Sequence, residues 1–344
     1  MKKTHILSVG RYMPQRIVTS EELEERCGFK KFGVKMGLTR MLTGCAQRHY
    51  AAEGEYCSDI AAKAGLDALN IAGVEPSEID ALIFCSVTQD FAEPATANVV
   101  ADKMNVRNAF VFDIKNACNA FLNGVDVADS LIKTGKAETV LVVSGEAFSR
   151  WTKFDYDNKA ELMERAPVAL SLGDGGGAFL LRGSDEEGCG IEKSYFHTYS
   201  DSWNHNVVWG GGVMYPHDAD KLYVPGTTKG IADRQLGIYK GILPKLKDIF
   251  GMTFADADCI IPTQVARWVV YNMSDLFAEQ LGGEPEEYVK KMVSVVDKFG
   301  NVGSSNIPIA AYEAIEKGMV KKGSKTFAVS VGVGISEGIM SITF

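Results

Sequence analysis

The sequence predicts an α/β protein made of two similar halves, and three observations support this fold class. Near-continuous apolar runs, typical of strands covered on both faces, alternate with helical patterns along the chain. Segments of the first half resemble segments of the second half at a nearly constant separation. The 344 residues are 46% hydrophobic and 23% charged, an ordinary globular composition with enough apolar side chains for a substantial core.

Each element is predicted from its own pattern. Short apolar runs bounded by turn residues predict strands at residues 6–9, 81–87, 109–114, 139–145, 178–181, 259–261, 292–296 and 326–332. Apolar residues at three- and four-residue spacing predict helices at residues 58–71, 95–104, 118–133, 231–250, 265–281 and 307–317. Gly135 marks the end of the third helix.

The internal similarity pairs residues 79–83 with 257–261, 112–135 with 296–318, and 139–145 with 326–332. The chain is therefore predicted to contain two copies of one α/β unit, over residues 1–184 and 185–344. In this overlay the strand-to-helix turn at 116–118 corresponds to the Gly-Asn-Val-Gly turn at 300–303. If the halves are related by a pseudo-two-fold axis, both turns would meet at one cleft.

The first of these turns contains a candidate nucleophile. An apolar strand leads into Cys118, and a mostly apolar helix is expected to start there. Unpaired N–H groups and the positive end of the helix dipole would favour a reactive thiolate at that position. The alternative is a cysteine that serves only as a small core side chain.

Glycine-rich segments suggest further functional loops. Residues 171–177 precede a strand and are expected to form a tight turn with close backbone approach, with phosphate binding as the alternative. Residues 195–222 form an aromatic, histidine-bearing insertion that is a candidate lid. The glycine-flanked turn at 331–336 follows a buried strand and could direct a backbone N–H into a cleft, as an oxyanion hole requires.

Composition excludes several classes of function. A net charge of -8 argues against binding to nucleic acid or to an anionic membrane surface. Seven cysteines without a CxxC pair indicate reduced thiols in the cytoplasm and predict no metal site. The first ten residues resemble a strand more than a signal peptide, and no apolar run approaches the roughly 20 residues of a membrane span.

Several motifs together resemble the thiolase superfamily, and within it the ketoacyl-ACP synthase III branch of initiating ketosynthases. They are Thr43-Gly44 before Arg48-His49, Phe112-Asp113 before Ala117-Cys118, Leu172-Gly173-Asp174-Gly175, Phe299-Gly300-Asn301 before Ile307-Pro308, and Gly332-Val333-Gly334 before Gly338. The resemblance covers nearly the whole chain. It implies a five-layered αβαβα fold and a homodimer.

The resemblance also assigns roles. Cys118 would take an acyl group from a CoA or acyl-carrier-protein thioester, while the N–H groups of Cys118 and Val333 hold the oxyanion. Asn301 matches the asparagine that binds the carbonyl of the second substrate. No cofactor or metal is implied, because the acyl thioester is itself the substrate.

The chain departs from the family at one catalytic position. The family has a histidine in a Pro-His-Gln-Ala pattern, whereas this chain has Thr263 after Pro262. A threonine cannot titrate near neutral pH, and general acid/base help is worth about 10²- to 10⁴-fold, or roughly 3 to 5 kcal/mol. Malonyl decarboxylation is therefore expected to be handicapped, with Thr263 lining the second-substrate position.

Three interpretations remain. The protein is a variant acyltransferase or condensing enzyme of a specialised fatty-acid- or polyketide-like pathway, an atypical decarboxylating synthase, or a non-catalytic subunit that pairs with an active homologue. Because Cys118, Asn301 and the terminal glycine turn are retained, an active acyltransferase is favoured.

Other residues are weaker candidates. Glu93 resembles the glutamate with which long-chain condensing relatives deprotonate an acyl α-carbon across the dimer, and its alternative is an exposed loop acid. The positions of the family's CoA adenine clamp fall near Leu38 and Leu42, so that clamp is expected to be absent. Arg150, Trp151 and Arg165 are candidates for a replacement donor site, since arginine suits phosphate and tryptophan suits adenine. His197, His205 and His217 are expected to be surface residues and His49 a structural one.

Overall fold

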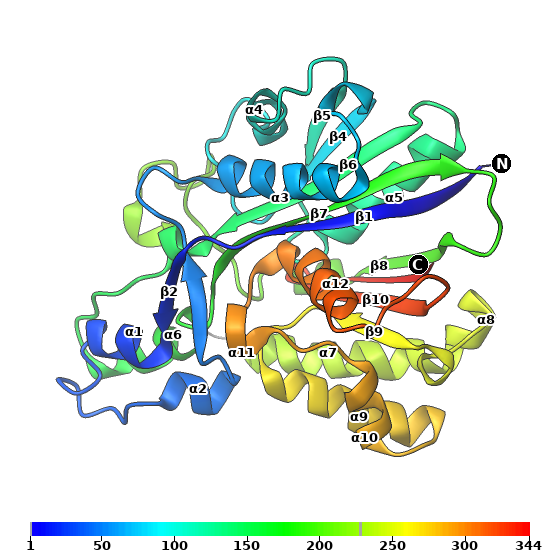
Figure 1. The fold of residues 1–344 in the computed structure, drawn as a ribbon. Helices are drawn as coiled ribbons and strands as arrows, with labels where there is room; N and C mark the ends of the chain where they lie inside the picture. The colour runs from blue at the N-terminus through cyan, green and yellow to red at the C-terminus, as the bar shows by residue number, and fades with distance from the viewer. Residues whose placement is uncertain (1, 227–228) are drawn as a thin grey trace.

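The computed structural model describes residues 2–226 and 229–344 and contains two main β-sheets layered with helices (Figure 1). The strands are β1 (Lys3–Tyr12), β2 (Arg16–Thr19), β3 (Gln47–Tyr50), β4 (Ala81–Cys85), β5 (Phe110–Ile114), β6 (Thr139–Ala147), β7 (Asp174–Ser184), β8 (Gly190–Thr198), β9 (Cys259–Pro262), β10 (Lys325–Gly332) and β11 (Ser336–Thr343). The helices are α1 (Ser20–Arg26), α2 (Leu38–Thr43), α3 (Cys57–Ala72), α4 (Thr96–Lys103), α5 (Ala120–Lys133), α6 (Lys159–Ala169), α7 (Lys229–Ile242), α8 (Leu246–Phe250), α9 (Arg267–Leu281), α10 (Pro285–Lys291), α11 (Val296–Phe299) and α12 (Asn306–Glu316).

The two sheets repeat one arrangement of strands. The first has the order β1-β7-β6-β4-β5, in which β4 and β6 are parallel and β7 and β1 continue antiparallel. The second has the order β8-β11-β10-β9, in which β9 and β10 are parallel and β11 and β8 continue antiparallel. This correspondence confirms the predicted internal repeat. The predicted boundary between residues 184 and 185 stays a prediction, although it falls between the two sets of strands.

The helices and sheets form five layers: helices, the first sheet, central helices, the second sheet and a last layer of helices. Three apolar cores hold these layers together. One core packs α3 and α4 on the outer face of the first sheet. The central core contains α5 and α12 between the two sheets, which Figure 1 shows for α12. A third core packs α7, α9 and α10 on the outer face of the second sheet. Near-continuous burial of β4 and β6 explains why these strands are apolar without alternation.

Two predicted elements differ from the structure. Residues 292–296 do not form a strand, since only the single bridge between Ile260 and Met292 remains and α11 begins at Val296. The helix expected over 231–250 is divided into α7, a 3₁₀ turn and α8, because Pro244 cannot continue the α-helical hydrogen bonding. The main chain of 227 and 228, just before α7, lies outside the described residues.

Three of the four glycines of the 171–177 segment lie in a strand, and Gly173 directly precedes that strand. Gly175, Gly176 and Gly177 belong to β7, where a Cβ on Gly177 would lie 2.6 Å from the Cβ of Pro308 in α12. The expected close backbone approach is confirmed, but its cause is helix-to-strand packing. In the described part of the chain, no helix has the length and apolar content needed to cross a bilayer.

Candidate active site

Turns from both halves of the chain meet at an apolar cavity of about 340 Å³. Cys118 contributes from the turn between β5 and α5, Asn301 from the turn after α11, and Val333 from the turn between β10 and β11. Much of the wall is aromatic or aliphatic, including Trp151 and Trp268. The expectation that both repeated turns converge on one cleft is therefore confirmed, and the volume lies within the range of small-molecule sites.

Cys118 lies at a sharp turn two residues before α5. Ala117 has a φ of 48°, in the left-handed region that a residue with a Cβ rarely adopts. The N–H of Asn119 donates to the carbonyl of Asn116 at 3.0 Å, which closes the turn. Cys118 was expected in the first turn of the helix. Helix α5 begins at Ala120, so Cys118 lies just before that turn.

The pKa of the Cys118 thiol is raised, whereas the helix dipole was expected to lower it. Burial raises its pKa to about 12, and the nearby Glu146 carboxylate raises it further, while the residue's own N–H lowers it. Removal of the charged sulfur from water is the largest of these influences, and it disfavours the thiolate. The sequence pattern therefore predicted the wrong direction for the pKa of this thiol.

Glu146 is a buried carboxylate that sequence analysis missed. It accepts hydrogen bonds from the N–H groups of Val87 and Thr88 at 2.9 and 3.0 Å, and from the Thr88 hydroxyl at 2.7 Å. It also accepts from the N–H and the hydroxyl of Ser304, at 3.2 and 2.6 Å. Burial raises its pKa, and these bonds oppose the rise. The sequence offered one indication of this residue, because Glu146 is an acidic residue directly after the apolar run at 139–145.

The turn at Asn301 is fixed from two sides. Its main chain forms two hydrogen bonds with the segment before β7. The Asn301 N–H donates to the Ser171 carbonyl at 2.9 Å, and the Gly173 N–H donates to the Asn301 carbonyl at 3.0 Å. Its side-chain Oδ1 accepts from the Gly303 N–H at 3.0 Å and from Asn306 Nδ2 at 2.8 Å. Because Oδ1 is committed to these donors, Nδ2 is the group that Asn301 can offer to a ligand in the cavity.

Gly332 brings the turn after β10 against the nucleophile. A Cβ on Gly332 would lie 3.2 Å from the main-chain nitrogen of Cys118, so only glycine allows this approach without a shift. Val333 follows directly and lines the cavity. This close approach brings the main chain before Val333 next to the main chain of Cys118.

Thr263 does not line the cavity, contrary to the expectation. It is 3% exposed, and its hydroxyl donates to Ser330 Oγ at 3.0 Å. The neighbouring Gln264 anchors the segment, since its side-chain oxygen accepts from the Val295 N–H at 2.9 Å. The Ser330 hydroxyl donates in turn to the carbonyl of Cys118 at 3.0 Å. No local signal distinguished Ser330 within its predicted strand.

The remaining acid and histidine candidates lie outside the cavity. Glu93 is exposed in the loop before α4, at the edge of the first sheet. His197, His205 and His217 are exposed, as expected. His49 is half-buried, its ring lies 5.7 Å from that of Phe299, and burial lowers its pKa. These positions agree with a structural role for His49.

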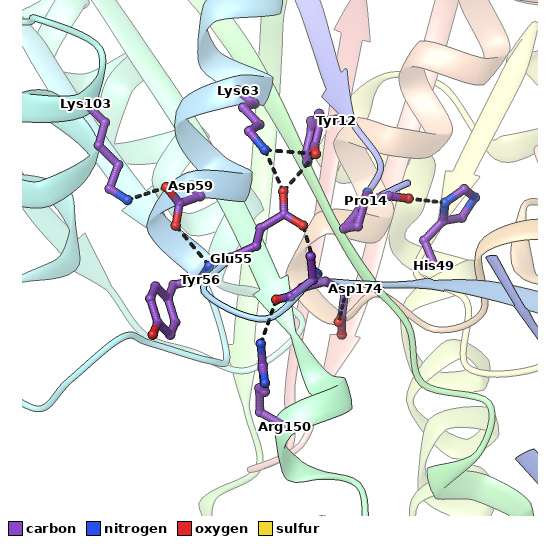
Figure 2. Close-up of polar contacts among 12 residues, drawn as sticks. Tyr12, Pro14, His49, Glu55, Tyr56, Asp59, Lys63, Lys103, Arg150 and Asp174 are labelled. Atoms are coloured by element: carbon purple, nitrogen blue, oxygen red, sulfur yellow. Dashed lines mark hydrogen bonds and ion pairs between the residues drawn. The ribbon is translucent and has the colours of Figure 1, made fainter. Parts of the chain in front are cut away.

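Of the three proposed donor-binding residues, only Trp151 lines the cavity. Arg150 is exposed and donates to the carbonyl of Ala52 at 2.8 Å, beside the network of Glu55, Lys63 and Tyr12 that Figure 2 shows. Arg165 lies on α6, where its main chain packs against Gly226. The three residues therefore do not form one site within this chain. Leu42, near the family's clamp position, lies at the cavity wall.

The insertion after β8 contributes to the wall of the cavity. Asn206 and Val208 line it, and the N–H of Val224 donates to the carbonyl of Trp151 at 2.9 Å. Part of the candidate lid therefore lines the cavity, whereas its first residues, up to Thr198, belong to β8. Among the residues described, no group of three or more histidine, cysteine or acidic side chains is placed to hold a metal ion.

These features define a class of protein: a thiolase-like fold in which a cysteine at a strained turn faces a cavity between two repeated halves. Residues 112–200 match the family of 3-oxoacyl-[acyl-carrier-protein] synthase III, and residues 248–344 match its C-terminal part. The chain therefore belongs to the 3-oxoacyl-[acyl-carrier-protein] synthase III family, and it is an acyltransferase of that kind.

Individual relatives agree with this family. The β-ketoacyl-[acyl-carrier-protein] synthase III of Listeria welshimeri is 32% identical, with 98% of this chain and 97% of the relative covered. That of Paramagnetospirillum magneticum is 30% identical over the same shares, 98% and 97%. Among solved structures, cerulenin-bound OleA of Xanthomonas campestris has a TM-score of 0.86 at 22% identity, covering 99% of this chain and 97% of that one. The Aquifex aeolicus synthase III has a TM-score of 0.82 at 24% identity, covering 99% and 100%, and these two structures support the thiolase-like fold.

Proposed function

We propose that this enzyme loads an acyl group from a CoA or acyl-carrier-protein thioester onto Cys118 and transfers it to a second substrate. The observation that carries the proposal is the meeting of the Cys118 thiol, the close approach of Gly332 and the Asn301 side chain at one apolar cavity. The pathway is proposed to be a specialised one, related to fatty-acid or polyketide synthesis, because the decarboxylating histidine position is Thr263.

In the first step, the sulfur of Cys118 attacks the carbonyl carbon of the donor thioester. A C–S bond to Cys118 forms, the C–S bond to the donor breaks, and the proton of Cys118 leaves with the donor thiol. The N–H groups of Cys118 and Val333 stabilise the oxyanion of the tetrahedral intermediate, which is typically worth about 10²- to 10³-fold per donor. The apolar walls suit an acyl chain, and no cofactor takes part.

In the second step, Asn301 Nδ2 is proposed to donate to a carbonyl oxygen of the second substrate. Its Oδ1 is held by Gly303 and Asn306, so the amide is fixed before the substrate binds. Such preorganisation makes a single donor more effective than a mobile one. With Thr263 committed to Ser330, Asn301 is the principal side chain proposed for this role.

The proposal includes a homodimer in which Glu93 of one chain reaches the partner's cavity. It is supported by the position of the Glu93 loop beside β5, since the Asp113 carboxylate of β5 accepts from the N–H groups of Thr96 and Ala97 at 2.8 Å. Within one chain Glu93 is exposed and is not among the residues that line the cavity. A dimer through the β5 edge would place both loops at the interface.

The test is intact-protein mass spectrometry after incubation with a panel of acyl-CoAs and acyl-acyl-carrier-proteins. We expect the mass of one acyl group to be added to the parent protein and the adduct to be lost in Cys118→Ala. Cys189→Ala, which removes a half-exposed cysteine distant from the cavity, should keep the adduct.

An adduct that survives Cys118→Ala would refute the assignment of the nucleophile. A parent protein that takes no acyl group from any donor would favour the second candidate, a non-catalytic subunit that pairs with an active homologue. The loss of the family histidine is the observation in favour of that candidate.

A further inference from the structure

Strand β10 lies against both the main-chain carbonyl and the main-chain nitrogen of Cys118. The Ser330 hydroxyl donates to the Cys118 carbonyl at 3.0 Å. Two residues further along, Gly332 lies so close that a Cβ there would be 3.2 Å from the Cys118 nitrogen. Because alternate residues of a strand face the same side, Ser330 and Gly332 both face the turn that carries the nucleophile.

The Ser330 hydroxyl is itself oriented by Thr263. The Thr263 hydroxyl donates to it at 3.0 Å, and the Thr263 N–H is fixed by a bond to the carbonyl of Val329 at 2.8 Å. Thr263 and Ser330 are 3% and 0% exposed, so water does not compete for these bonds. Consecutive hydroxyl donors polarise one another, which strengthens the final bond to Cys118.

The Cys118 carbonyl needs such a partner because of its place in the chain. The hydrogen bond that leads into α5 runs from the Asn123 N–H to the Asn119 carbonyl at 3.1 Å, one residue after Cys118. The preceding Ala117 has the unfavourable φ of 48°. A conformation of this kind persists only where surrounding contacts hold it in place.

We propose that Ser330 is a positioning residue for the nucleophile, with Thr263 orienting it. The bond from Ser330 fixes the Cys118 turn against β10, and β10 leads directly into Val333. It thereby sets the separation between the two N–H donors of the oxyanion hole. This inference rests on the proposed function, because it assigns the hydroxyl pair a part in the same acyl-transfer site. It also gives Thr263 a task other than that of the family histidine.

The test compares single-turnover acylation of Cys118 in variants that remove or keep the hydroxyls. We expect Ser330→Ala to lower the maximal rate by about 10- to 100-fold, as misplacement of reacting groups does, with an unchanged half-saturating donor concentration. Ser330→Thr should restore most of the rate. Thr263→Val should lower the rate less than Ser330→Ala, and Thr263→Ser should restore it.

Ser341→Ala is the matched control, since Ser341 is a buried serine of the same sheet whose hydroxyl donates to the Lys193 carbonyl at 3.5 Å, away from the cavity. It should acylate at the parent rate. Hydrogen-exchange mass spectrometry provides a second readout, in which Ser330→Ala should accelerate exchange of the amides of residues 117–120 and Ser341→Ala should not.

Two outcomes would overturn the inference: equal acylation rates in parent and Ser330→Ala, or equal losses in Ser330→Ala and Ser341→Ala. If the parent takes no acyl group from any donor, the proposed function fails, and hydrogen exchange decides the inference alone. Unchanged exchange at 117–120 would then overturn it.

Discussion

Cys118 combines a tightly held main chain with a thiol that resists ionisation. Burial raises its pKa to about 12, so only a small fraction is thiolate at neutral pH. Acyl transfer therefore depends on a donor that displaces water and on the N–H groups that stabilise the developing oxyanion. We expect Cys118 to be alkylated slowly near neutral pH when no donor is bound, since the thiolate is the reactive form.

This pKa predicts the pH dependence of alkylation. Below the pKa, the thiolate fraction grows about tenfold per pH unit, so the rate of Cys118 alkylation by iodoacetamide should rise in that proportion from about pH 6 to 9. Peptide mass spectrometry follows Cys118 separately from Cys189, which is also partly exposed. A plateau between about pH 6 and 8 would show that the thiol is activated at rest and contradict the prediction.

Residues of the site differed in how readily the sequence revealed them. Cys118, Asn301 and Val333 follow apolar strand patterns and belong to family motifs, so their meeting at one cavity could be predicted. The orientation of Thr263 could not, because it depends on Ser330, 67 positions away in the chain. The pKa of Cys118 depends on burial and on Glu146, which are tertiary properties.

Among the elements, β11 contains a buried acid that the proposed reaction does not use. Glu337 is 2% exposed, and its Oε2 has no hydrogen-bond partner among the described residues. Burial raises its pKa to about 7, whereas a hydrogen bond with Tyr195 and the charge of Lys245 lower it. Tyr199 and Tyr239 also face this carboxylate and add no positive charge.

The raised pKa makes Glu337 a source of pH-dependent stability. Since the folded pKa lies above the usual value of 4.5, the folded state binds the proton more tightly, and the free energy of unfolding should fall as pH rises from about 4.5 through about 7. Glu337→Gln should abolish this decrease in the free energy of unfolding. The free energy of unfolding of the variant minus that of the parent should therefore increase from pH 4 to pH 8, by up to roughly 3 kcal/mol.

Urea unfolding of parent and variant at both pH values measures the effect. The control is Glu192→Gln, the same substitution at an exposed acid of the neighbouring strand β8 that pairs with Lys3 at 3.4 Å, and it should change the stability by less than Glu337→Gln does. An equal stability difference between parent and Glu337→Gln at both pH values would contradict the assignment.

The sequence predicted elements well where one pattern dominated. Strands covered on both faces and the helices of the central core were found, because their apolar residues are continuous or helically spaced. Strands β8 and β11 were missed, since serine, glycine and charged residues interrupt their apolar pattern. The counterpart of β5 was predicted at 292–296 because those residues are apolar, but their burial comes from helix packing and a single bridge.

At the scale of the whole molecule, β5 leaves one edge of the first sheet open. It is the last strand in the order β1-β7-β6-β4-β5, and Phe110 is 47% exposed. The Phe110 ring stacks on that of Phe112 at 5.8 Å. An apolar edge strand of this kind is a template for pairing with a second chain, and we expect two copies to pair through it.

The expected result is a dimer in solution that Phe110→Asp converts to a monomer. Light scattering coupled to size-exclusion chromatography measures the mass. The control is Ile17→Asp, at a similarly exposed apolar residue on β2, which should leave the dimer intact. A dimer that Phe110→Asp leaves intact would place the interface elsewhere. A parent protein that is a monomer would exclude the dimer.

The central core has a consequence for how the chain folds. It is made of side chains from both halves, with α5 and α12 packed between the two sheets, so neither half can bury its apolar surface alone. The repeat in the sequence therefore does not create two independent folding units. We expect one cooperative unfolding transition, and a break in the chain between β7 and β8 would leave two fragments that are stable only in association.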